Sequence, residues 1–113
     1  MAKVEIAEDL KKEIFKKFKS ESLEIFELMN SLKENPKKGK PVGQVGGIVI
    51  KELKYNSFRF YFITDGFKLK FLQISELHNL LIKFVRVSDK KTQQKTIEEI
   101  KIILRHFGKE GFN

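Results

Sequence analysis

Apolar residues near the N-terminus recur with a period that predicts a short strand followed by an amphipathic helix. The stretch VEI at residues 4–6 favours a strand. Leu10, Ile14 and Phe18 then follow at intervals of four, which predicts a helix from about Glu8.

A second helix is predicted to begin at Ser20, since serine is a favoured N-cap residue. Its apolar stripe consists of Leu23, Phe26, Met29 and Leu32. Asn35-Pro36 should end it, because the residue before proline is pushed out of the α region. The two helices are expected to form an αα-hairpin that covers a sheet.

Glycine and proline predict a loop for residues 36–47, PKKGKPVGQVGG. These glycines match neither a Walker motif nor a dinucleotide-binding fingerprint, so no nucleotide cofactor is indicated.

From Ile48 onward, alternating apolar and polar residues predict antiparallel strands, with hairpin turns at Asn56-Ser57 and Asp65-Gly66. Pairing across both turns sorts the side chains onto two faces. The first face collects Leu53, Tyr55, Phe58, Phe60, Phe62, Leu69 and Phe71, and the second collects Glu52, Lys54, Arg59, Tyr61, Lys68 and Lys70. The first face is a predicted core and the second a basic surface; Lys51 and Ile63 are the two exceptions.

The C-terminal part predicts a strand over LLIKFVRVS, after a turn at residues 75–79, and then a helix. Thr96 and Glu99 have the spacing of a capping box, and Gly108 should terminate the helix. The predicted architecture is a single α+β domain over residues 1–113, with a short N-terminal strand, an αα-hairpin, an antiparallel sheet of about four strands and a C-terminal helix. We expect the helices to cover one face and to leave the basic face partly open.

The amino-acid composition excludes several kinds of functional site. The chain has no cysteine, which excludes disulfides, thiolate zinc sites and cysteine nucleophiles. The N-terminus lacks an apolar run of signal-peptide length, and no stretch approaches a membrane span, so we expect a cytoplasmic protein without a membrane partner.

Positive charge lies in the C-terminal two thirds of the chain. Residues 1–35 carry 7 basic and 8 acidic groups, whereas residues 36–113 carry 16 basic and 7 acidic groups. The net charge is +8. Such a distribution indicates either a polyanionic partner, most often nucleic acid, or a lysine-rich surface that serves solubility.

Several motifs together resemble the RelE/ParE toxin superfamily, and within it the HigB-like, phage-derived group. They are GKP at 39–41, ELK at 52–54, FRFYF at 58–62 and KKTQQKTIEEI at 90–100. This chain departs from the family in having Lys54 in place of an arginine, about eight additional residues (QISELHNL, 73–80), and Arg86 where the HigB-like group often has histidine.

The resemblance implies the toxin of a type II toxin-antitoxin system, a ribosome-dependent messenger-RNA endonuclease that needs no metal or other cofactor. Its partners would be the ribosome, messenger RNA and a cognate antitoxin, which we expect to be small and acidic. Two alternatives stay open: a non-enzymatic gyrase inhibitor like the ParE branch, and an inactive homologue that binds RNA or antitoxin.

Candidate residues follow from the chemistry of RNA cleavage, in which the 2′-hydroxyl attacks the adjacent phosphorus. Glu52 is a candidate base, and a lysine such as Lys54 is a candidate base or acid. Arg59 is a candidate bidentate phosphate clamp, and Arg86 is either a second clamp or an indirect proton source for the leaving group. Candidate RNA-binding residues are Tyr61, Lys68, Lys70, Lys90, Lys91 and Lys95. His78 and His106 are expected to be surface groups.

Overall fold

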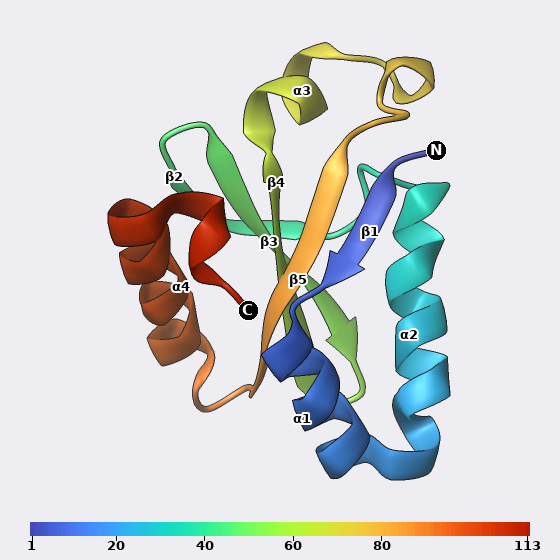
Figure 1. Ribbon diagram of the computed structural model, residues 1–113, viewed down its shortest axis with the longest axis vertical. Helices are drawn as coiled ribbons and strands as arrows, with labels where there is room; N and C mark the ends of the chain where they lie inside the picture. Colours follow the sequence, from blue (N-terminus) through green and yellow to red (C-terminus); the bar gives the residue numbers. More distant parts are fainter.

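The computed structural model describes all 113 residues and contains a five-stranded mixed sheet with helices on both faces (Figure 1). The elements are β1 (Lys3–Ile6), α1 (Glu8–Phe18), α2 (Ser22–Asn30), β2 (Lys40–Val45), β3 (Ile48–Tyr55), β4 (Phe58–Asp65), α3 (Gly66–Phe71), β5 (Leu81–Asp89) and α4 (Gln93–Phe107). The strand order is β1-β5-β4-β3-β2. β1 runs parallel to β5, and the other neighbours are antiparallel. None of the helices has the length and apolar character required to cross a bilayer.

The α+β class, the N-terminal strand, the helices that follow it and the C-terminal helix are as predicted. The sheet is not: it has five strands rather than about four, and it is mixed rather than antiparallel. The mixed pairing arises because β1 lies beside β5, at the edge opposite β2.

Helix α1 agrees with its predicted stripe. It begins at Glu8, and Leu10, Ile14 and Phe18 are its buried residues. The turn after it differs from the prediction, because residues 19–21 form a 3₁₀ turn and α2 begins at Ser22 rather than after Ser20.

The stripe predicted for α2 is only partly correct. Met29 of α2 and Leu32, in the 3₁₀ turn that follows, are buried, but the helix buries Ser22 and Ile25 where Leu23 was expected. Leu23 is 70% exposed. The buried Ser22 hydroxyl is satisfied because it donates to the Ile14 carbonyl at 3.1 Å.

The β3–β4 hairpin has the predicted register. Tyr55 pairs with Phe58, and Lys54 pairs with Arg59, around the turn at Asn56-Ser57. Phe58 and Phe60 contact Phe18 of α1, with ring centroids 5.0 and 5.7 Å away. The aromatic side of the hairpin therefore lies in the core beneath α1.

Strand β2 lies within the segment predicted to be a loop. It pairs with β3 from Lys40 to Val45 and forms the outer edge of the sheet. An edge position accommodates Pro41, since a proline cannot donate a hydrogen bond to a further strand.

The hairpin predicted at Asp65-Gly66 is wrong, because the chain turns there into the helix α3. Asp65 is its N-cap residue and accepts a hydrogen bond from the Lys68 backbone N–H at 3.0 Å. Phe71 is consequently exposed and Leu69 only partly buried, so neither belongs to the sheet.

The second face of the sheet, predicted to be partly open, carries the helix α4, which was expected on the other face. Helix α4 begins at Gln93, a turn earlier than predicted, with Thr92 as N-cap, so the proposed capping box of Thr96 and Glu99 is wrong. The helix packs against β2 and β5 on the face opposite α1 (Figure 1). It ends at Phe107, where Gly108 has the expected positive φ of 65°.

Candidate functional site

The residues of the predicted basic face that lie in strands do project together. Cross-strand partners share a face, and Glu52 pairs with Tyr61 while Lys54 pairs with Arg59. Tyr61 also pairs with Arg86. We call this side of β3, β4 and β5 the polar face.

A bulge in β5 brings Arg86 onto the polar face. Phe62 pairs with Phe84 and Tyr61 with Arg86, so Val85 is the extra residue. In a regular strand, residues two apart share a face. Here Phe84 instead packs on Phe62 in the core, at 4.9 Å between ring centroids, while Arg86 faces the other way.

Glu52 and Arg59 form a mostly buried ion pair on the polar face. Their side chains are 2% and 12% exposed, and Arg59 Nε lies 3.6 Å from Glu52 Oε2. Neither of these two atoms has a hydrogen-bond partner. The contact is therefore electrostatic, and it holds the guanidinium beside the carboxylate without satisfying either group fully.

Tyr61 lies beside this pair and is completely buried. Its hydroxyl is 2.8 Å from Ser88 Oγ, and Ser88 in turn donates to the Asp89 carbonyl at 2.9 Å. Burial raises the pKa of Tyr61, against the opposing effect of the Ser88 hydrogen bond, and the negative charge of Glu52 raises it further. Tyr61 cannot stack on an RNA base in this arrangement.

Arg86 is bound to the helix that covers the face. Its Nε donates to Glu99 Oε1 of α4 at 2.7 Å, and its Nη1 donates to the Val85 carbonyl at 2.8 Å. The guanidinium also lies 5.3 Å from the centre of the Phe112 ring. Glu99 thus neutralises Arg86, and the pair fastens α4 to β5.

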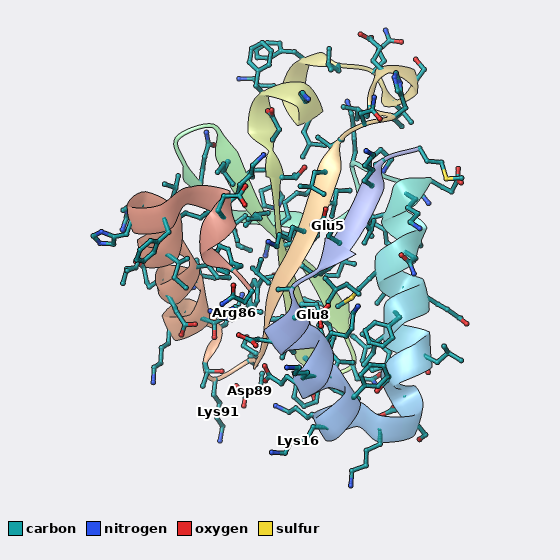
Figure 2. All side chains as sticks on the ribbon, viewed as in Figure 1. Glu5, Glu8, Lys16, Arg86, Asp89 and Lys91 are labelled. Carbon is teal, nitrogen blue, oxygen red and sulfur yellow. The ribbon has the colours of Figure 1, made fainter.

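Exposed lysines gather at the end of the sheet where the β3–β4 turn, the β5–α4 turn and the end of α1 meet. Figure 2 shows Asp89 and Lys91 at this end, on the same side of the molecule as Lys16 of α1. The Lys17 ammonium lies 4.8 Å from the ring centre of Phe58, which pairs with Asp89. We define the basic end as Lys17, Lys54, Arg59, Lys90 and Lys91.

Asp89 shapes the β5–α4 turn that carries two of these lysines. Its Oδ1 accepts hydrogen bonds from the backbone N–H and the hydroxyl of Thr92, at 2.9 and 3.0 Å. These bonds lower the pKa of the Asp89 carboxyl. The turn places Lys90 and Lys91 in the loop position predicted for them, whereas Lys95 lies in the first turn of α4.

Two predicted RNA ligands are not part of this site. Lys68 and Lys70 belong to α3, beyond the far end of β4, because the strand that would have placed them on the polar face does not form. His78 and His106 are exposed.

Three participants were not identified from the sequence. Ser88 is the partner of Tyr61, Glu99 is the partner of Arg86 rather than a capping residue, and Lys17 reaches the basic end from α1. The serine could have been noticed as the one small polar residue in the apolar run LLIKFVRVS, but the other two depend on contacts between distant segments.

The solvent-accessible groups of the site are cations. Lys54 is exposed and Arg59 is reachable at its margin, whereas Glu52 and Tyr61 are closed off. No group of three or more histidine, aspartate or glutamate side chains is placed to hold a metal ion. The arrangement can bind an anion and stabilise developing negative charge.

Comparisons with protein-family models, with curated proteins and with solved structures found no match to this chain.

The pairing of Glu52 with Arg59 predicts non-additive stability effects. Replacing Glu52 by leucine leaves a mostly buried guanidinium without a countercharge, and we expect a loss of about 3 kcal/mol in the free energy of unfolding. The double variant Glu52→Leu/Arg59→Met should regain most of this loss, because no buried charge remains. Urea denaturation of wild type, both single variants (Glu52→Leu and Arg59→Met) and the double variant measures the coupling, and a loss in the double variant equal to the sum of the two single losses would show that the pair is not coupled.

The burial of Tyr61 predicts a delayed ionisation. The chain has two tyrosines, and the pKa of Tyr55 is raised to about 12 by burial and by Glu21 and Glu24. In a Tyr55→Phe variant, Tyr61 is the one tyrosine left. Its ionisation, followed by tyrosinate absorbance, should reach its midpoint above pH 10 in the native protein and near pH 10.0 in denaturant.

Linkage gives the sign of the accompanying change in stability. Between the unfolded pKa of Tyr61 and its higher folded pKa, the unfolded chain binds fewer protons, so the free energy of unfolding should fall as pH rises above about 10. Half-ionisation of the native variant at pH 10 or below would contradict the buried position of Tyr61.

Proposed function

We propose that this protein is a toxin of the RelE/ParE kind, the toxin component of a type II toxin-antitoxin system, which cleaves messenger RNA on the ribosome. The observation that carries the proposal is the basic end, where Lys54 and Arg59 face each other across the β3–β4 pair. The guanidinium is held by Glu52, and Lys90 and Lys91 stand nearby on the β5–α4 turn. A fixed guanidinium beside mobile ammonium groups suits an RNA phosphate.

The motifs that resemble the toxin family lie in the elements that form the basic end. ELK at 52–54 lies in β3 and FRFYF at 58–62 in β4, and these two strands pair. KKTQQKTIEEI at 90–100 forms the turn into α4 and its first turns. Segments separated along the chain thus contribute their cations to one end of the sheet.

RNA provides its own nucleophile. The 2′-oxygen attacks the adjacent phosphorus, the bond from phosphorus to the 5′-oxygen breaks, and a 2′,3′-cyclic phosphate and a 5′-hydroxyl result. The 2′-hydroxyl proton must be removed and the leaving 5′-oxygen must gain one. The pentavalent intermediate carries additional negative charge that fixed cations stabilise.

Arg59 is assigned to bind the scissile phosphate, and Glu52 is a positioning residue that orients it. This differs from the expected role of Glu52 as the base, because its carboxylate is closed off and faces Arg59. Lys54 is the exposed titratable group beside Arg59, and we assign to its ammonium the protonation of the leaving 5′-oxygen, while the 2′-hydroxyl proton passes to solvent. Lys90 and Lys91 bind the RNA backbone.

A second candidate is a homologue that binds RNA or an acidic antitoxin without cleaving RNA. The observation that favours it is the closure of the polar face, where Glu52 and Tyr61 are buried and Arg86 is neutralised by Glu99. It would use the same basic end.

Expression in a bacterial host tests the two candidates. Lys54→Ala should reduce cleavage of translated messages by about 10²-fold, because it removes the proton-transfer group and a cation at the phosphorane. Arg59→Lys should also reduce cleavage, since an ammonium keeps the charge but cannot bind a phosphate bidentately. Mapping of cleaved messages by sequencing measures both.

Lys12→Ala is the matched control, because it removes an exposed lysine of α1 that is not part of the basic end. Cleavage that persists in the Lys54→Ala/Arg59→Ala double variant would exclude these residues from the mechanism. Intact messages together with binding of RNA would favour the second candidate, and intact messages together with DNA damage would favour a gyrase inhibitor.

A further inference from the structure

A second cationic site lies on the other side of the sheet. A cavity of about 560 Å³ opens between β3 and α3. Lys51 lines it and is adjacent in sequence to Glu52, so the two side chains leave β3 on opposite faces. The cavity is therefore separate from the polar face. Its lining at Gly47, Val49 and Gly66 lies at the end of the β3–β4 pair opposite the basic end.

The charged residues that line this cavity all have one sign. Lys37, Lys51 and Lys70 line it, and no aspartate or glutamate does. Lys51 is 5% exposed, and its ammonium donates to the Lys37 carbonyl at 2.9 Å. Burial lowers the pKa of Lys51. An anion in the cavity would compensate charges that the protein itself leaves without a carboxylate partner.

Two aromatic rings form the α3 side of the cavity. Phe67 and Phe71 are 65% and 61% exposed, although phenylalanine is usually buried. Their ring centroids lie 4.8 Å apart, and the Lys70 ammonium is 5.4 Å from the ring centre of Phe71. Exposed rings bordered by lysines are the arrangement on which proteins stack unpaired bases while they bind the adjoining phosphates.

We propose that this cavity binds an unpaired nucleotide of single-stranded RNA, with its base stacked on Phe71 and its phosphates at Lys37 and Lys70. The cavity has the size of a small-ligand pocket, and an open cationic rim lets a strand enter and leave. This proposal shares with the proposed function only its ligand, RNA. It would bind the strand at the end of the β3–β4 pair opposite the basic end, and it requires no cleavage.

The test uses a fluorescent, 2′-O-methylated single strand, which cannot be cleaved by attack of the 2′-oxygen, so the result does not depend on whether the protein cleaves RNA. Phe71→Ala should weaken binding about tenfold, because one stacking platform is lost. The control Phe107→Ala removes a ring of similar exposure from α4 and should leave binding unchanged. Anisotropy titrations measure both.

Salt dependence tests the phosphate contacts. Lys70→Gln should reduce the slope of log K against log salt by about 0.7, the change expected for one phosphate contact to a single strand. Lys12→Gln removes the same charge from α1 and should leave the slope unchanged.

Equal effects of the target and control variants would overturn the proposal. A second contrary result would come from an oligoglutamate peptide. If Phe71→Ala weakens binding of this peptide and leaves RNA binding unchanged, the cavity is a site for acidic peptides. A duplex of the same sequence that binds as tightly as the single strand would also contradict base stacking.

Discussion

Strand β4 is buried on both faces, and the rest of the structure depends on how its two sets of side chains are covered. Phe60 and Phe62 face the core beneath α1, where aromatic packing satisfies them. Arg59 and Tyr61 face α4 instead, and a buried charge or hydroxyl without a partner would be costly. Glu52 and Ser88, from the two neighbouring strands, supply those partners.

This constraint explains why the proposed RNA-binding surface is smaller than the full polar face. Helix α4 is fastened to β5 by Arg86 and Glu99 and covers the middle of the face. Only the end near the β3–β4 turn stays open, and there Lys54 and the margin of Arg59 meet the lysines of the β5–α4 turn. The buried Glu52 and Tyr61 help to hold the accessible cations in place. The Glu52–Arg59 ion pair therefore contributes both to the stability of the fold and to the proposed phosphate site.

Predictions from sequence succeeded where the determining contacts are local. The stripe of α1 repeats within one helix, and the β3–β4 register follows from a two-residue turn. The hairpin at Asp65-Gly66 failed because aspartate before glycine suits both a tight turn and a helix N-cap. A strand after it would need the free edge of β4, and β5 occupies that edge.

The other errors have the same origin in non-local contacts. Strand β2 contains Pro41 and Gly43, which are poor strand residues, and pairing with β3 outweighs their weak propensity. The two residues that broke the predicted sorting are explained by the segments that cover them. Lys51 donates to a carbonyl of the loop before β2, and Ile63 is buried because its face is covered too.

The chemical nature of the RNA ends tests the central claim most directly. Attack by the 2′-oxygen, with charge stabilised by Lys54 and Arg59, predicts messages cut on the ribosome with 2′,3′-cyclic phosphate and 5′-hydroxyl ends. Mass spectrometry or end-specific ligation of the fragments measures this. Fragments with 5′-phosphate ends, or identical cleavage without ribosomes, would contradict the account.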